Sequence, residues 1–316
     1  MKKAVLVLAL LLIGSLVLFG CGDNSNDASD NGETATETEN NTEAGNNEDS
    51  DDSEENQDID FSTMIEARGS DTMVNLGQRW AEEFMNEYSE ASMSVTGGGS
   101  GTGIAAMING TIDIALSSRA IREEEIDQAA DNGVEVVEFV TGRDGIAIAV
   151  HPDNPVEELT MADLKAIFTG EKRNWSDFGG EDAEITLYSR ESNSGTYVFF
   201  REFVLEDEDY ASFANLMPST QAIVEGVIQD EHGIGYIGLA YLDDDGIQGV
   251  SIAAEEGETA AFPSMENVIA GDYPVARPLF LYTDGQPEGV VELFMDFVMG
   301  EQGQQIVEDI GFVPVQ

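Results

Sequence analysis

The chain has 316 residues, enough for two modest domains, and a formal net charge of −50 from 63 acidic and 13 basic residues. So acidic a chain excludes nucleic acid as a partner, because phosphate backbones are bound by clustered basic side chains. Scarce lysine with acidic residues along the whole chain is typical of a halophilic protein, since concentrated salt screens self-repulsion. A specialised cation-binding surface is the alternative.

The first 21 residues are predicted to be a lipoprotein signal peptide. A basic start, Met1 to Lys3, precedes an apolar run from Ala4 to Leu18 that is short for a membrane span, and LFGC ends this segment at Cys21. Cys21 is the only cysteine, which excludes a disulfide framework and a thiolate metal site. We expect it to carry the lipid that anchors the protein at the cell surface or in the periplasm. A plain secretory signal or an N-terminal membrane anchor are the alternatives.

Residues 22–60 contain 15 acidic residues, no basic ones and almost nothing apolar. Such a segment cannot bury enough surface to offset the entropy lost on ordering, so we predict an acidic disordered linker. The folded part is expected to span 61–316. It remains acidic, with Lys165 and Lys172 as its only lysines.

Strand-like and helix-like segments alternate from residue 65 onward. The predicted strands and extended segments are 93–97, 111–118, 134–140, 145–150, 184–189, 233–242 and 274–283. The predicted helical segments are 74–88, 101–110, 160–170, 195–204 and 288–310. This alternation implies an α/β fold with mixed or parallel sheets.

Three loop-to-helix junctions combine glycine, hydroxyl side chains and helix-start amides: RGSDTMVN (68–75), GGGSGTG (97–103) and RESNSGT (190–196). The first turn of a helix has unpaired N–H groups and partial positive charge, so it can hold an oxyanion without a basic surface. Arg190 in the third junction adds a planar, bidentate cation.

Each junction alone has a simpler explanation. Ser70, Asp71 and Thr72 are ordinary capping candidates for the helix at 74–88, glycine triplets form turns, and Arg190 could pair with Glu191 at the surface. Three such junctions in one α/β chain favour a shared oxyanion site.

The folded region resembles the phosphate-binding protein of bacterial and archaeal ABC phosphate transporters over nearly all of 65–316. The segments that carry the resemblance are GSDTM, GGGSGTGIAAMINGTIDIALSSR, DGIAIAVHPDNPV, IFTGEKRNW, RESNSGT, GIGYIGLAY, YPVARPLFLY and GFVPV. It implies a two-lobed type II periplasmic-binding-protein fold, in which two hinge strands join α/β lobes that close on the ligand. We place lobe 1 at 61–145 plus 277–316 and lobe 2 at 146–276.

The resemblance also implies a set of ligand-binding positions at the three junctions. They are Ser70, Asp71, Thr72, the Met73 amide, Ser100, Arg190, Ser194, Gly195 and Thr196. One position departs from the family, because Ser118 stands where well-described members have a carboxylate that accepts the proton of monohydrogen phosphate. We hypothesise that Asp71 or another carboxylate supplies this acceptor, with Arg119 pairing with it or contacting the ligand.

The resemblance implies a monomer that captures inorganic phosphate and passes it to the membrane permease subunits of an ABC transporter, with no cofactor and no metal. An enzyme is the first rival, with Ser100 or Ser194 as nucleophile, but His151 and His232 lie in turns without a triad context. The second rival is a protein that binds sulfate, molybdate or tungstate, or one that only senses an oxyanion.

Overall fold

The computed structural model describes residues 59–242 and 246–315, which belong to one unit, Gln57–Gln316. The predicted signal peptide, Cys21 and nearly all of the predicted linker lie outside the described residues. Within the described part of the chain, no helix combines the length and the apolar character that crossing a bilayer requires.

The elements form two lobes. The first lobe contains β1 (Ile65–Gly69), α1 (Val74–Glu87), β2 (Met93–Thr96), α2 (Ser100–Ile108), β3 (Ile114–Ser117), α3 (Glu123–Asp131), α8 (Gly289–Met299) and α9 (Glu301–Ile310). The second contains β5 (Glu158–Thr160), α4 (Met161–Phe168), the 3-10 helix η1 (Trp175–Phe178), β6 (Thr186–Arg190), α5 (Gly195–Phe203), β7 (Asn215–Met217), α6 (Thr220–Ile228), β8 (Gly233–Gly238), η2 (Leu239–Tyr241), β9 (Gln248–Ala253) and α7 (Met265–Ala270).

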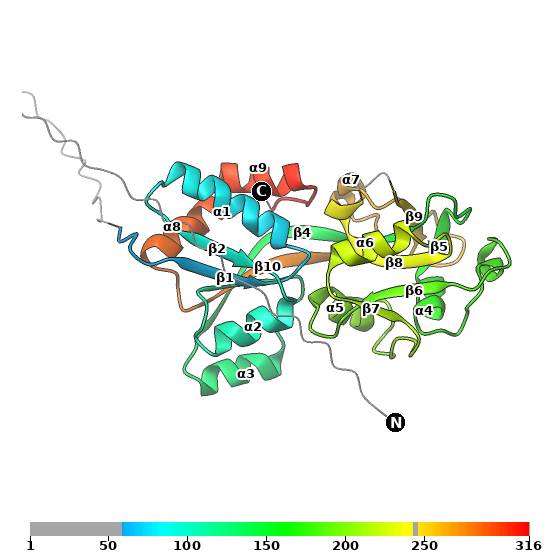
Figure 1. The fold of residues 1–316 in the computed structure, drawn as a ribbon, viewed down its shortest axis with the longest axis horizontal. Coiled ribbons are helices and arrows are strands. Elements are labelled where there is room, and N and C mark those ends of the chain that lie inside the picture. The colour runs from blue at the N-terminus through cyan, green and yellow to red at the C-terminus, as the bar shows by residue number, and fades with distance from the viewer. Residues whose placement is uncertain (1–58, 243–245, 316) are drawn as a thin grey trace, which may run out of the picture. The chain divides into compact units, whose positions relative to one another are not determined.

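Two long strands, β4 (Val136–Val150) and β10 (Ala276–Asp284), connect the lobes (Figure 1). The first part of β4 pairs antiparallel with β10 inside the first sheet, whose order is β2-β1-β3-β10-β4. From Ile146 onward β4 pairs with β8 and β9 of the second sheet, which continues through β6 to β7. The predicted α/β fold with two hinge strands is confirmed, whereas the lobe limits at 145/146 and 276/277 stay a prediction.

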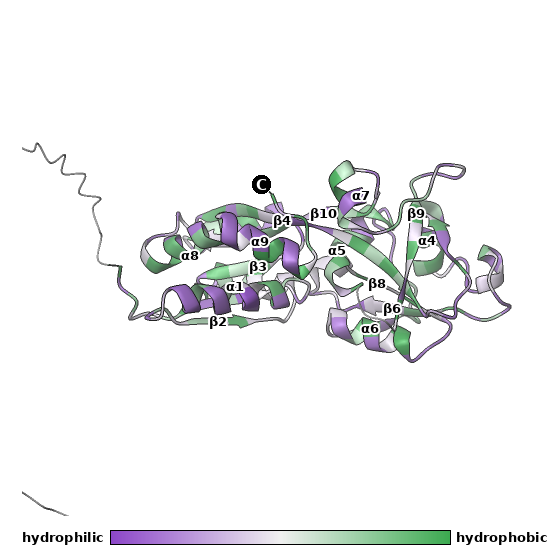
Figure 2. Ribbon diagram, turned by 90° about the horizontal axis from the view of Figure 1, so that it is seen from above, coloured by the Kyte–Doolittle hydropathy of each residue, from purple (hydrophilic) through white to green (hydrophobic). Residues whose placement is uncertain are grey.

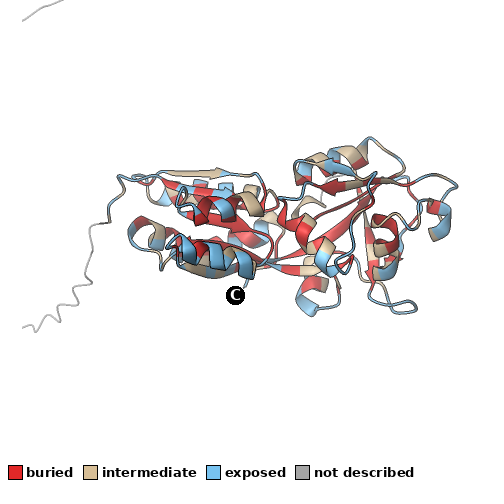
Figure 3. Cartoon of the chain, turned by 90° about the horizontal axis from the view of Figure 1, so that it is seen from below, coloured by how far each residue is buried: buried red, intermediate tan, exposed pale blue. Residues whose placement is uncertain are grey.

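Helices cover both faces of the first sheet, with α1, α8 and α9 on one side and α2 and α3 on the other (Figure 1). The apolar residues of α1 recur at helical spacing, so Leu76, Trp80 and Phe84 all face the sheet. The Phe84 ring meets the edge of Phe294 from α8 at 5.2 Å. The strands between these layers are mostly apolar and buried, and the outer faces of the helices are mainly polar (Figures 2 and 3).

The core of the second lobe continues directly into the candidate site. Phe200 of α5 stacks on Tyr236 of β8 at 4.3 Å between ring centroids, and Phe168 of α4 packs against both rings at 4.9 and 5.5 Å. The Tyr236 hydroxyl, at the end of this aromatic stack, accepts from the Arg190 amide at 3.1 Å. The core therefore fixes the backbone from which the Arg190 side chain leaves β6.

One strand is longer than the sequence predicts. The predicted strands at 134–140 and 145–150 form one strand, β4, because Gly142 and Gly145 both remain paired with β10. α4 begins with a capping box, since the Asp163 amide donates to Thr160 Oγ1 at 3.0 Å and the Thr160 amide donates to Asp163 at 3.1 Å.

Candidate functional site

Two of the three predicted helix starts carry polar side chains that do not cap a helix. α1 begins after Met73 and α2 after Gly99, and neither start has a side-chain capping bond. The capping role considered for Ser70, Asp71 and Thr72 is therefore wrong. These three residues make their hydrogen bonds to other segments of the chain, at the junction of the two lobes.

Three serine hydroxyls lie together where β1 and β3 end and α2 begins. Ser70 Oγ donates to Ser118 Oγ at 2.8 Å, Ser118 Oγ lies 3.3 Å from Ser100 Oγ, and the Ser118 amide donates to Ser100 Oγ at 3.1 Å. Gly195, at the start of α5, packs directly on this serine cluster. A Cβ atom at position 195 would lie 2.8 Å from Ser118 Oγ and nearer still to Ser100 Oγ, so only glycine allows the second lobe to approach this closely.

Two threonine hydroxyls from opposite lobes meet beside the serine cluster. Thr72 Oγ1, just before α1, lies 2.9 Å from Thr196 Oγ1 in the first turn of α5. Both side chains are buried. Thr72, Ser100 and Gly195, one from each predicted junction, therefore lie together.

Arg190 reaches across from the second lobe to Asp71 of the first. Its Nη2 donates to Asp71 Oδ2 at 2.6 Å, its Nη1 donates to Thr220 Oγ1 at 3.1 Å, and carbonyls before α6 accept its remaining bonds. Asp71 Oδ1 accepts from the Gly98 amide at 2.9 Å. Only 2% of the Arg190 side chain is exposed. The partner of Arg190 is thus Asp71, and the surface pair with Glu191 considered from the sequence is wrong.

A second buried ion pair, which the sequence analysis missed, lies next to the two threonines. Arg277 of β10 donates through Nη2 to Asp144 Oδ2 of β4 at 2.9 Å, and both side chains are fully buried. Burial raises the pKa of Asp144, although the charge of Arg277 opposes this shift. The available signal was the presence of charged residues in two otherwise apolar segments, Arg143 and Asp144 in GRDGIAIAV and Arg277 in PVARPLFLY.

Backbone amides at two helix starts complete the donor set. Within the described residues, the amides of Ser100, Gly195 and Thr196 have no protein acceptor. Two groups that were predicted to bind the ligand have partners within the protein instead. The Met73 amide donates to the Ser70 carbonyl at 3.1 Å, and Ser194 Oγ caps α5 by accepting from the Tyr197 amide at 3.4 Å.

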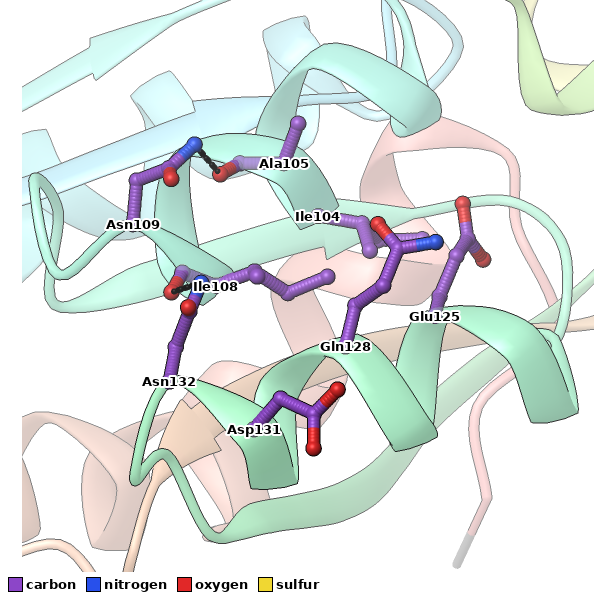
Figure 4. Close-up of a pocket in the computed structure, with 8 residues that line it drawn as sticks. All are labelled: Ile104, Ala105, Ile108, Asn109, Glu125, Gln128, Asp131 and Asn132. Atoms are coloured by element: carbon purple, nitrogen blue, oxygen red, sulfur yellow. Dashed lines mark hydrogen bonds between the residues drawn. The ribbon is translucent and has the colours of Figure 1, made fainter.

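Arg119 does not join the other predicted residues. Both of its Nη atoms donate to the Glu125 carboxylate, at 2.6 and 2.7 Å. Glu125 also lines a cavity of about 360 Å³ between α2 and α3, where Asn109 and Asn132 donate to backbone carbonyls (Figure 4). This cavity contains no candidate ligand-binding residue. Arg119 therefore ties α3 to the loop after β3, beside the site.

The lobes touch each other around the site. Asn193 Nδ2 donates to the Gly98 carbonyl at 2.9 Å, and its carbonyl accepts from the Gly101 amide at 3.0 Å. Gly99 lies between them with φ of +88°, and a Cβ atom there would be 2.6 Å from the Asn193 carbonyl oxygen. The structure thus represents a closed arrangement of the lobes.

The arrangement has the chemistry of an oxyanion site. Hydroxyls, unpaired amides and two guanidinium groups converge in a region with little solvent, where charge-assisted hydrogen bonds are strong. No group of three or more metal-ligating side chains occurs among residues 59–242 and 246–315. His151 accepts from the Asp153 amide in its own turn, as the sequence suggested.

The fold and the site define the class of the protein, a two-lobed binding protein of the PBP superfamily. The model of the PBP superfamily domain matches residues 32–302. Within that superfamily the chain belongs to the family of the phosphate-binding protein PstS. It is 33% identical to PstS of Bacillus subtilis over 321 residues, which covers 100% of this chain and 95% of the relative.

Other relatives support the same family. PstS of Pseudomonas aeruginosa is 31% identical over 264 residues, covering 78% of this chain and 81% of that one. A Clostridium perfringens protein, described as a phosphate ABC transporter substrate-binding protein and solved with phosphate bound, matches with a TM-score of 0.73 at 31% identity. The match covers 80% of this chain and 100% of that chain. The members are binding proteins, so the chain is not an enzyme.

Proposed function

We propose that this chain captures inorganic phosphate between its two lobes outside the cytoplasm and delivers it to an ABC transporter, while a lipid on Cys21 anchors it. The lobes, with the limits given above, would open and close about β4 and β10, and the permease subunits would receive the ligand. Replacing Cys21 with serine should then release the protein from the membrane fraction. Retention of that variant would argue against the lipid anchor.

One observation carries the binding proposal. Ser100, Ser118 and Thr72 of the first lobe meet the start of α5 of the second lobe at one buried place, and Arg190 of the second lobe binds Asp71, the neighbour of Thr72. An anion held there would bond to both lobes at once, so binding and closure would be coupled. The donors are hydroxyls, amides and guanidinium groups, which explains how an anion could bind to so acidic a protein.

A protein for another oxyanion, such as sulfate, is the second candidate. This candidate is favoured because both nearby carboxylates already accept from an arginine, Asp71 from Arg190 and Asp144 from Arg277, so each is less available to accept the proton of a phosphate. The hydroxyl of Ser118 is a weaker acceptor for a phosphate proton than a carboxylate would be.

Calorimetric titration of the purified protein with phosphate, arsenate, sulfate and molybdate at high salt distinguishes these candidates. Phosphate binding that excess sulfate does not displace would support the proposal. Tighter binding of sulfate or molybdate would replace it with the second candidate.

The same titration of Asp71→Asn tests whether Asp71 accepts the phosphate proton. Asparagine has a similar shape but lacks the charge, and its single oxygen can replace only one of the two carboxylate oxygens that accept from Arg190 and Gly98. Loss of discrimination between phosphate and sulfate would assign this role to Asp71, and unchanged discrimination would leave Asp71 only as the partner of Arg190.

A further inference from the structure

The fully buried Arg277 lies where β10 passes between the lobes, and its contacts extend beyond its partner Asp144. Its Nη1 donates to the Ser118 carbonyl at 2.7 Å. Its Nη2 donates to Thr196 Oγ1 at 3.0 Å and lies 3.5 Å from Thr72 Oγ1. One guanidinium thus contacts a serine of the cluster and the two threonines that meet across the lobes.

The chemistry of these groups fixes the direction of the hydrogen bonds. A guanidinium can only donate, whereas a hydroxyl has one hydrogen and two lone pairs. Thr196 Oγ1 therefore accepts from Arg277, and its hydrogen must point elsewhere. In the 2.9 Å contact between Thr72 and Thr196 only one hydrogen can lie between the oxygens. An anion that enters this contact can accept from both hydroxyls.

We propose that Arg277 is a positioning residue, which directs the Thr72 and Thr196 hydroxyls as donors toward an oxyanion bound between the lobes. This inference rests on the proposed function and names residues that determine its specificity. Because the two threonines come from different lobes, Arg277 also holds the donors of both lobes at a common point in the closed state.

Asp144 keeps the guanidinium in the required orientation. Its Oδ2 accepts from Nε at 3.2 Å and from Nη2 at 2.9 Å of Arg277, and its Oδ1 accepts from the Leu239 amide at 3.0 Å. The ring of Phe199 lies 5.7 Å from the Arg277 guanidinium carbon. If Arg277 only held β4 and β10 together, its ion pair with Asp144 would be sufficient. Its contacts with hydroxyls of both lobes therefore indicate a further role at the site.

The test is a double-mutant cycle on phosphate affinity, measured by calorimetry at 25 °C with the full protein. Arg277→Lys keeps the charge, but a compact ammonium cannot span the same acceptors. Arg277→Lys and Thr196→Val should each weaken binding about tenfold or more. If Arg277 acts through the two threonines, adding Arg277→Lys to the variant Thr72→Val/Thr196→Val should cost less than about threefold. Arg79→Lys, at an exposed position of α1, is the matched control and should bind like the wild type.

Additive losses in the cycle, or wild-type affinity of a folded Arg277→Lys protein, would overturn the inference. Circular dichroism and thermal melting establish folding. If Arg277→Lys does not fold, Arg277→Gln/Asp144→Asn takes its place in the cycle, because it removes both buried charges together. A wild-type protein that binds no phosphate would remove the proposed function, whereas wild-type binding with an additive cycle would remove only the role of Arg277.

Discussion

The hydroxyl residues near the helix starts of this protein fall into two groups. Ser194 and Thr160 cap helices in the ordinary way, whereas Ser100 and Thr72 make no cap and are held by bonds across the molecule. In both groups the hydroxyl residue stands at or just before a helix start in the sequence. What differs is the partner, which for Thr72 is more than 100 positions away, at Thr196.

The residues of the three junctions could be identified from the sequence because glycine, hydroxyl and helix start occur together locally. Arg277 and Asp144 could not, because their pairing joins positions 133 residues apart and Asp144 has another possible partner, Arg143, directly beside it in the sequence. Arg119 was misplaced for the opposite reason. Its partner Glu125 is only six residues away, but it lies in an acidic stretch where no single carboxylate stands out.

Removing Arg190 should abolish tight phosphate binding. In Arg190→Met the anion loses the charged donor of the second lobe, and Asp71 is left as an unpaired, largely buried carboxylate facing the site. We expect the affinity to fall by about 100-fold or more. Calorimetry on Arg190→Met and on the exposed Arg79→Met control measures this. Wild-type affinity of a folded Arg190→Met protein would contradict the placement of Arg190 at the ligand.

Among the elements, the hinge strands set both the topology and the site. The sequence analysis recognised the apolar character of β4 but divided it in two, because glycines ordinarily interrupt a strand. Here a Cβ atom at Gly142 would lie 3.2 Å from Val307 of α9, and one at Gly145 would lie 2.9 Å from Val268 of α7. These close contacts require small residues within a continuous strand, and they come from helices that are distant in the sequence, so the sequence around β4 does not reveal them.

α3 is the element whose attachment should depend on pH. Burial raises the pKa of Glu125, but the hydrogen bond from Arg119, together with the Arg122 amide and both arginine charges, outweighs this and lowers the pKa below its ordinary value. A lowered carboxyl pKa in the folded protein contributes stability above the unfolded pKa, which is lost as the pH falls through the folded pKa.

Glu125→Gln should therefore be less stable than the wild type at neutral pH, and this difference should shrink as the pH falls below about 4. Urea unfolding from pH 7 to pH 3.5 measures the difference. Glu124→Gln is the control, because Glu124 is exposed and lies 3.9 Å from the nearest guanidinium nitrogen of Arg122. A difference for Glu125→Gln that stays constant over the whole range would show that the ion pair does not stabilise α3.

For the whole molecule, the contrast between surface and site is the main physical feature. The formal charge of −50 is spread along the chain, while the two arginines of the site are buried and paired with carboxylates. Surface repulsion acts through solvent and is screened within about 10 Å at 0.1 M salt and about 3 Å at 1 M, whereas buried pairs are screened much less. Added salt should thus weaken the repulsion between surface charges without disrupting the buried ion pairs of the site.

The melting temperature should accordingly rise with salt, by about 5 °C or more between 0.1 and 2 M NaCl. KCl and choline chloride at matched ionic strength should give the same rise, because screening does not depend on which monovalent cation is present. Replacing the exposed Glu255, Glu256 and Glu258 with glutamine should raise the melting temperature at 0.1 M and reduce the gain from salt. A rise in melting temperature that saturates at millimolar concentrations of one cation would instead indicate the specialised cation-binding surface. A melting temperature that falls with salt would show that attraction between surface charges outweighs their repulsion.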